Sequence, residues 1–259
     1  MPEPQPQSAT RPRACNPLRV ALFYLLLVLS VLIWGVICLL VAPWLPYRTR
    51  YYMVAVLWSR FAVDCACRVV GIRYRLTGLE NIPAEPCVVA ARHQSTWETL
   101  FLSALFHPLS QVLKKELLNI PFFGWGLRLL KPIALDRKKR NKALTRLLEQ
   151  GSRYLEEGSW VLIFPEGTRV PAGQIGRFSR GAAMLSIETS RPLLPIAHNA
   201  GQFWPREGWG KRSGTIEVVI GPPLYPHGEG SEAVADLTGR TYQWIAQAQQ
   251  AMGDLPPSA

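Results

Sequence analysis

The sequence is poor in acidic side chains. Of its 259 residues, 18 are Asp or Glu and 29 are Lys or Arg, which gives a formal net charge of +11 at pH 7. A basic balance favours anionic partners such as nucleic acid, anionic lipid or a phosphorylated substrate. The basic residues are scattered and form no nucleic-acid-binding motif, so we expect no nucleic-acid partner. Two interpretations remain: a surface that lies against anionic lipid headgroups, and a dedicated basic binding site.

Cysteine is also scarce, and the five that occur form no pattern typical of a redox or zinc pair. Their number is odd, and a single residue separates Cys65 from Cys67, where such pairs usually have two. Cys38 and Cys87 lie inside apolar runs. We interpret the cysteines as buried free thiols in a reducing compartment. We expect no metal site and no bound cofactor.

Charge is absent from Val20 to Ala42, a run dominated by Leu, Val and Ile. The run is long enough to cross a membrane as a helix. It is too long for a typical signal peptide, and no small-x-small cleavage site follows it. Aromatic residues suited to a membrane interface come next, in 43–47. Residues 1–17, rich in Pro, Gln and Arg, predict a disordered basic tail.

A second segment, residues 50–70, mixes aromatic and aliphatic side chains with Arg60, Asp64 and Arg68. These charges argue against a second membrane span and favour an amphipathic helix that lies in the interface or pairs with the first helix. Arginines flank the first helix on both sides, so the positive-inside rule gives no orientation. A hairpin that dips into one leaflet satisfies both flanks. We therefore expect a membrane-anchoring helical pair over residues 18–70.

From Gly71 onward the pattern changes to short apolar runs that alternate with helical periodicity. This alternation predicts an α/β domain over residues 71–259, with a mostly parallel sheet sandwiched by helices. The expected strands are 73–76, 87–91, 111–113, 132–135, 160–164, 193–197 and 215–220. The expected helices are 97–106, 138–157, 180–189 and 231–252.

A histidine and a carboxylate follow the second expected strand, at His93 and Glu98. A histidine backed by a carboxylate is the usual apparatus for taking a proton from an alcohol near neutral pH. The competing interpretation is a capping box, with Ser95 as the N-cap and Glu98 at the third helical position. Capping explains Glu98 without catalysis. It does not explain a histidine at the end of a buried strand, where ligands approach α/β sheets.

Three further stretches place charge beside expected strands. In 164–169, Gly167 lets the backbone approach a ligand and Arg169 suits bidentate contact with phosphate, although an ordinary turn with a surface salt bridge would have the same residues. Arg137 ends the expected strand 132–135. Lys114 and Lys115 precede the apolar stretch 120–126, which contacts either an acyl chain or the core. The other three histidines are interpreted as structural or exposed: His107, His198 and His227.

Taken in order, these stretches resemble the glycerolipid acyltransferase family, specifically bacterial 1-acyl-sn-glycerol-3-phosphate acyltransferases. The family's His-x4-Asp motif looks like His93 to Glu98, with Glu in place of Asp. Its second motif resembles 133–137, its third closely matches Phe-Pro-Glu-Gly-Thr-Arg at 164–169, and its fourth resembles 193–196. The Lys114 to Gly124 segment also looks like the family's. The resemblance covers about residues 20–223.

The resemblance implies acyl transfer from acyl-CoA or acyl-carrier protein to the 2-hydroxyl of lysophosphatidic acid, without an acyl-enzyme. It implies that His93 is the general base, that Glu98 orients it, and that Lys114 stabilises the oxyanion. The implied substrate-binding residues are Glu166, which positions the glycerol hydroxyl, Arg169 and Arg137, which bind phosphate, and Gly167, Thr168 and Lys115.

The resemblance also implies membrane lipids as partners and a place in the bacterial inner membrane, with the site facing the cytoplasm. Three alternatives remain open. They are acylation of another lysolipid such as lyso-ornithine lipid, a membrane-anchored lipid-binding protein without turnover, and a thioesterase-like hydrolase.

Overall fold

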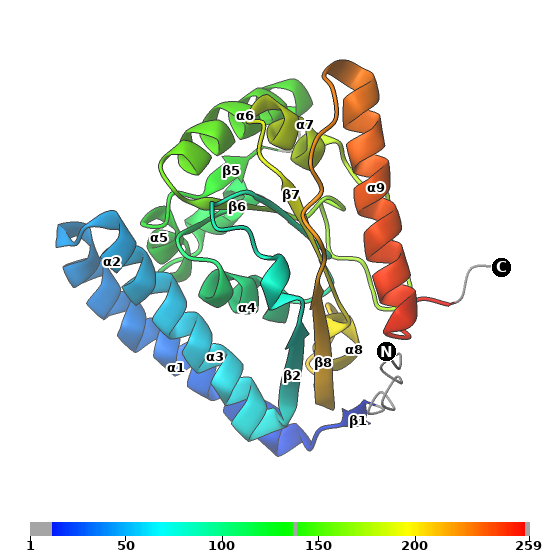
Figure 1. The fold of residues 1–259 in the computed structure, drawn as a ribbon. Coiled ribbons are helices and arrows are strands. Elements are labelled where there is room, and N and C mark those ends of the chain that lie inside the picture. The colour runs from blue at the N-terminus through cyan, green and yellow to red at the C-terminus, as the bar shows by residue number, and fades with distance from the viewer. Residues whose placement is uncertain (1–11, 137–138, 257–259) are drawn as a thin grey trace.

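A central eight-stranded sheet organises the fold (Figure 1). The computed structural model describes residues 12–136 and 139–256. The strand order is β1-β8-β7-β3-β6-β4-β5, and β2 also pairs with β8. The strands are β1 (Arg13–Ala14), β2 (Ile72–Thr77), β3 (Val88–Ala91), β4 (Leu109–Lys114), β5 (Ile133–Leu135), β6 (Trp160–Ile163), β7 (Leu193–His198) and β8 (Arg212–Ile220).

The middle of the sheet is parallel. Strands β7, β3, β6, β4 and β5 run in one direction, whereas β8 is antiparallel to β7 and to β1. Every residue of β3, β6 and β7 is buried, because helices cover both faces of these strands. The prediction of an α/β fold with a mostly parallel sheet is confirmed. All seven expected strands are present, and β1 is an addition.

Two apolar cores lie on opposite faces of the sheet, and the pleat of β3 divides its side chains between them. Val89 and Ala91 belong to the core formed with α4 (Trp97–Leu105) and the N-terminal helices, while Val88 and Ala90 belong to the core formed with α6 (Arg140–Glu156), α7 (Gly181–Glu188) and α9 (Gly230–Ala251). Figure 1 shows these two groups of helices on opposite sides of the sheet. The helices are α1 (Pro17–Val41), α2 (Tyr47–Tyr51), α3 (Trp58–Cys65), α4 (Trp97–Leu105), α5 (Phe123–Arg128), α6 (Arg140–Glu156), α7 (Gly181–Glu188), α8 (Ala200–Phe203) and α9 (Gly230–Ala251).

The helical pair is a hairpin of two long helical segments. The first is α1, which begins at an Asn16 cap whose side chain accepts a hydrogen bond from the Leu18 N–H at 2.8 Å. The second helical segment consists of α2, the π-helical η2 (Tyr52–Leu57), α3 and the π-helical η3 (Ala66–Val70). It ends at Gly71, which adopts a left-handed φ of 75°. Within the described residues, Pro17–Trp44 is the one helix long and apolar enough to cross a membrane.

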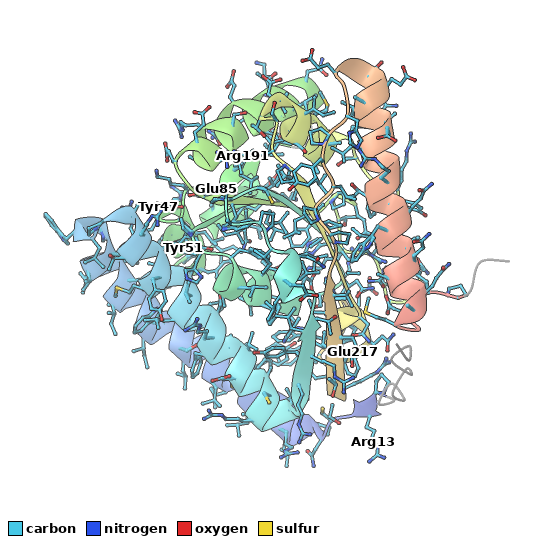
Figure 2. All side chains as sticks on the ribbon, viewed as in Figure 1. Arg13, Tyr47, Tyr51, Glu85, Arg191 and Glu217 are labelled. Atoms are coloured by element: carbon cyan, nitrogen blue, oxygen red, sulfur yellow. The ribbon has the colours of Figure 1, made fainter. Side chains whose placement is uncertain are left out.

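The helical pair shares its core with the sheet domain. Phe23, Tyr51, Val56 and Ala66 belong to the same buried cluster as Ile216 of β8. Figure 2 shows Tyr47 and Tyr51 on the side of α2 that faces the rest of the molecule, and the Tyr47 hydroxyl donates to the Leu130 carbonyl at 3.2 Å. The expected boundary at residues 70 and 71 is therefore a change of sequence pattern, and it does not separate two cores.

The N-terminal tail also differs from the expectation of disorder over residues 1–17. Residues 1–11 lie outside the described part of the chain. Arg13 and Ala14 form β1, which pairs with Ser213 and Arg212 of β8. The reason is that the end of β8 extends beyond β7 and offers free backbone groups to a second strand.

Candidate active site

His93 and Glu98 lie in direct contact between β3 and α4. The Nδ1 atom of His93 is 2.9 Å from Oε1 of Glu98. Because a carboxylate accepts hydrogen bonds, this contact places the ring proton on Nδ1 and leaves Nε2 free to take a proton. The imidazole stacks on Phe164, with ring centroids 4.0 Å apart and an interplanar angle of 16°. The imidazole is thus held at its Nδ1 edge by Glu98 and on one face by Phe164.

The Glu98 carboxylate also caps the start of α4. Its Oε1 accepts the backbone N–H of Gln94 at 3.0 Å and that of Ser95 at 2.9 Å, and its Oε2 accepts the Ser95 hydroxyl at 2.7 Å. Ser95 Oγ in turn accepts the Trp97 N–H at 2.8 Å. The helix begins one residue later than the capping-box interpretation expected, because its N-cap is Thr96 and Glu98 is its second residue. Ser95 and Glu98 nevertheless hydrogen-bond to each other at the start of the helix, so the two interpretations of Glu98 are compatible. One carboxylate completes the cap and contacts the histidine.

The buried position of Glu98 affects its charge. Burial raises the pKa of this carboxyl, but hydrogen bonds from His93 and Ser95 outweigh burial and lower the pKa to about 2. Glu98 is therefore ionised at any pH at which an enzyme normally works.

The loop that follows β6 holds His93 by its backbone. Glu166 accepts the His93 N–H at 3.0 Å and the Gly176 N–H at 2.9 Å, and it pairs with Arg92 Nε at 3.2 Å. The Val170 N–H donates to the His93 carbonyl at 2.7 Å. Neither the Glu166 nor the Arg92 side chain has any solvent exposure. Glu166 therefore differs from the expectation that it touches the glycerol hydroxyl, because Arg92 and the backbone already occupy its oxygens.

The histidine faces a largely apolar cavity of about 380 Å³. At the site, the cavity is lined by His93, Thr96, Lys114, Phe164, Gly167 and Arg169. It continues between α4, α5 and the helical pair as far as Val31, Trp34, Gly35 and Cys38 of α1. Leu117, Phe122, Phe123 and Gly126 also line it, so the stretch 120–126 contributes to the cavity wall. The alternative that this stretch merely fills the core is thereby disfavoured.

Of the four cationic residues expected at the site, Lys114 and Arg169 line the cavity. Lys114 lines the cavity with a side chain that is 54% exposed, 3.9 Å from Glu116. Arg169 lines it too, and the described part of the chain offers its guanidinium no carboxylate partner. Lys115 is exposed and is not among the described residues that line the cavity. Arg137 lies outside the described residues.

Of the other two residues of the 166–169 motif, Gly167 lines the cavity, and Thr168 is not among the described residues that line it. Gly167 adopts a left-handed φ of 68°, and a Cβ there would meet no atom within 4 Å. The glycine is therefore required by backbone conformation and not by a close neighbour. Thr168 is exposed beside it.

Sequence reasoning missed several side chains that support His93. Arg92 is fully buried, and its one signal was a charge at the end of an otherwise apolar strand. His198, expected to be structural or exposed, is buried and structural: its Nε2 donates to the Arg92 carbonyl at 3.0 Å, and its Nδ1 accepts the Ala200 N–H at 3.3 Å. Burial lowers the pKa of His198, so its ring is neutral. Gln94, which precedes Ser95 in the same loop, and its hydrogen-bond partner Asp254 belong to no sequence motif that could have identified them.

Known proteins resemble this chain in sequence and in fold. A family model described as Acyltransferase matches residues 73–199. The 1-acyl-sn-glycerol-3-phosphate acyltransferase of Pseudomonas aeruginosa is 54% identical over 240 residues, 93% of this chain and 92% of that protein. The enzyme of the same name from Saccharomyces cerevisiae is 28% identical, over 92% of this chain and 84% of that protein.

A solved structure extends the likeness to three dimensions. The crystal structure of the 1-acyl-sn-glycerophosphate acyltransferase PlsC from Thermotoga maritima matches with a TM-score of 0.76 at 23% identity, covering 94% of this chain and 98% of that one. At this identity the match shows a shared fold, including the N-terminal helices. Together with the 54% identity over nearly the full length of the Pseudomonas protein, it shows that this chain belongs to the 1-acyl-sn-glycerol-3-phosphate acyltransferase family.

Proposed function

We propose that this protein transfers a fatty acyl group from acyl-CoA or acyl-carrier protein to the 2-hydroxyl of 1-acyl-sn-glycerol 3-phosphate, which gives phosphatidic acid. The observation that carries the proposal is the His93–Glu98 pair, whose histidine lines an apolar cavity that Lys114 and Arg169 also line. The pair supplies a base, the cavity accommodates a hydrocarbon chain, and the two cations suit anionic groups.

In the proposed reaction, His93 Nε2 takes the proton of the 2-hydroxyl as the oxygen attacks the thioester carbonyl. The carbonyl oxygen becomes an oxyanion, and the tetrahedral intermediate collapses with cleavage of the C–S bond. The imidazolium then returns its proton to the leaving thiolate, so the products are the ester and a free thiol. Ionised Glu98 stabilises the imidazolium and keeps the ring proton on Nδ1.

Lys114 and Arg169 carry the electrostatic part of the proposal. Lys114 stabilises the oxyanion from the cavity wall, because an ammonium close to developing negative charge lowers the barrier. Arg169 binds the phosphate of the acceptor through its planar pair of donors. Glu166 contributes indirectly: its buried carboxylate holds the His93 backbone, so we assign it no contact with substrate.

The proposed setting is the bacterial inner membrane, with the site open to the cytoplasm. Two features support it. The exposed apolar face of α1 suits lipid, and the cavity reaches α1 itself, so a lipid chain can enter from the membrane side. The donor thioester is water-soluble and comes from the cytoplasm.

The first experiment is acyl transfer from labelled acyl-CoA to 1-acylglycerol 3-phosphate, with membranes that carry wild-type protein or His93→Ala. Removal of a general base typically lowers the rate by 10²–10⁴-fold, so we expect about that loss of kcat without loss of folded, membrane-bound protein. A His107→Ala variant, altered outside the cavity, is the matched control. Near wild-type turnover in His93→Ala would contradict the assignment of the base.

Parallel assays distinguish the other functions. Transfer to lyso-ornithine lipid or lysophosphatidylcholine alone would keep the chemistry and replace the acceptor. Consumption of donor without acceptor would show a hydrolase. If acyl-CoA gives no product, the assay is repeated with acyl-carrier protein, and failure with both donors would leave a lipid-binding protein.

A further inference from the structure

The last turn of α9 reaches the residue next to His93. Gln94 is fully buried, and its amide is held at both ends. Its Oε1 accepts the Gly201 N–H at 3.1 Å, and its Nε2 donates to Asp254 Oδ2 at 2.6 Å. The other oxygen of Asp254 accepts the Gln202 side-chain amide at 2.9 Å. The Gln94 side chain therefore cannot change position without breaking a hydrogen bond to α8 or to the end of α9.

The backbone turn that ends α9 delivers Asp254 to this position. Gly253 has a left-handed φ of 68°, and its N–H donates to the Gln250 carbonyl at 2.9 Å. The Asp254 N–H donates to the Gln249 carbonyl, also at 2.9 Å. In this type of helix ending, the residue after the glycine usually packs an apolar side chain against the helix. Here it is a carboxylate with 2% exposure, which is costly unless it is hydrogen-bonded.

A second contact from the same turn supports the other neighbour of His93. Gln249 Nε2 donates to the His198 carbonyl at 2.7 Å, and His198 Nε2 donates to the Arg92 carbonyl at 3.0 Å. The turn thus reaches Arg92 through His198 and Gln94 through Asp254. The residues immediately before and after His93 are both connected to the end of α9.

We propose that Asp254 is a positioning residue for acyl transfer, which holds Gln94 and so fixes the loop that carries His93. The inference rests on the proposed function. Asp254 lies beyond residues 73–199, the part that the family model matches. Of the described residues that line the cavity, none is Gln94 or Asp254, so neither side chain is placed to touch substrate.

Because Asp254 lies outside the cavity, its loss should affect kcat and KM differently. If Asp254 acts through the loop, its loss displaces the base and leaves the substrate-binding surface in place. A displacement of about 1 Å can lower a rate by roughly 100-fold, so we expect Asp254→Ala to reduce kcat by about 10- to 100-fold. The KM values for donor and acceptor should stay within about twofold. Asp236→Ala, on the exposed face of the same helix, is the matched control and should change neither constant.

Two further variants use the hydrogen-bond pattern. In Asp254→Asn, the remaining oxygen can accept from Gln94, and the new amide can donate to Gln202 once that side chain turns over, so most activity should be retained. Gln94→Glu places two carboxylates at the 2.6 Å contact and should lower kcat. Combining Gln94→Glu with Asp254→Asn restores a donor to this contact and should recover activity, which a general loss of stability would not do.

Every variant is purified as the full chain, and its thermal unfolding midpoint and amide hydrogen exchange are measured beside its kinetics. In Asp254→Ala we expect faster exchange over residues 92–98 and unchanged exchange in β4. A fall in kcat that matches the unfolded fraction, a rise in KM alone, or no recovery in the double variant would overturn the proposal. If the wild type transfers no acyl group, the proposed function fails, and unchanged exchange over residues 92–98 would then refute the positioning role separately.

Discussion

Arg169 is the residue to which the proposed function assigns the phosphate of the acceptor. It lines the cavity that His93 faces, and its guanidinium has no carboxylate partner in the described part of the chain. The nearby arginine Arg92 is the opposite case, because it is fully buried and paired with Glu166. One arginine of this site is therefore available to a ligand, and the other maintains the architecture.

This difference predicts a selective kinetic effect. Arg169→Ala should raise the KM for 1-acylglycerol 3-phosphate by about 10-fold or more, because a charge-assisted hydrogen bond contributes roughly 1.5–3 kcal/mol. The KM for the acyl donor should change little. Initial rates with each substrate varied in turn measure both constants, and Arg177→Ala is the control. Equal increases for the two substrates would instead indicate a structural role.

At the scale of elements, the start of α4 contains a carboxylate, Glu98, that contacts both the backbone of the helix start and the imidazole of His93. Glu98 accepts hydrogen bonds from two backbone N–H groups, one hydroxyl and one imidazole. The N-terminus of a helix also favours negative charge. The same contacts that keep the carboxylate ionised also stabilise the helix, so the charge of Glu98 should contribute to folding.

The lowered pKa of Glu98 predicts how this contribution depends on pH. In the unfolded chain the carboxyl has its ordinary pKa of 4.5, and in the folded protein the pKa is about 2. The stabilisation is therefore complete above about pH 4.5 and is lost as the pH falls toward 2. Between these limits, the difference in unfolding free energy between wild type and Glu98→Gln should shrink by roughly 3 kcal/mol.

Denaturant unfolding in detergent at a series of pH values measures this difference. Glu149→Gln, on the exposed face of α6, should differ little from wild type at every pH. A gap between wild type and Glu98→Gln that stays constant from pH 6 to pH 3 would show that the Glu98 charge does not stabilise the fold.

At the scale of the whole molecule, the helical pair has two roles. One side completes the core beneath the sheet, through residues such as Phe23 and Val56. The other side of α1 exposes a row of large apolar residues: Leu25, Val28, Leu29, Ile33, Val36 and Leu40. Deletion of the pair would expose the core and could not report on membrane attachment alone. Substitutions on the outer face test attachment directly.

We expect Leu29→Lys combined with Ile33→Lys to weaken membrane attachment. A lysine at the centre of a membrane helix costs about 3 kcal/mol, and the core-facing side of α1 stays intact. Sedimentation with membranes in high salt should fall, while the thermal unfolding midpoint in detergent is maintained. The control pair is Ala235→Lys and Gln243→Lys on α9, on the opposite side of the molecule (Figure 1). Unchanged sedimentation of the α1 variant would contradict a lipid-facing role for this side.

The sequence determined the seven strands from β2 to β8 and the longer helices, because these depend on local periodicity and end signals, whereas β1 depends on its pairing with β8. Short apolar runs predicted β3, β6 and β7, which are buried on both faces, and the spacing of Ser95 and Glu98 predicted the contact between these two residues at the start of α4. The ordered motifs also indicated that His93, Glu98, Lys114 and Arg169 belong to one site, and all but Glu98 line the same cavity.

Only the tertiary structure decided which polar side chains serve the ligand and which serve the fold. Glu166 looked like a substrate contact in the sequence, but Arg92 and the backbone of two distant loops occupy it. Asp254 lies 160 residues from Gln94 along the chain, and no local pattern connects the two. Burial and hydrogen-bond saturation arise when separate segments pack together, so a motif can identify a carboxylate without revealing what it binds.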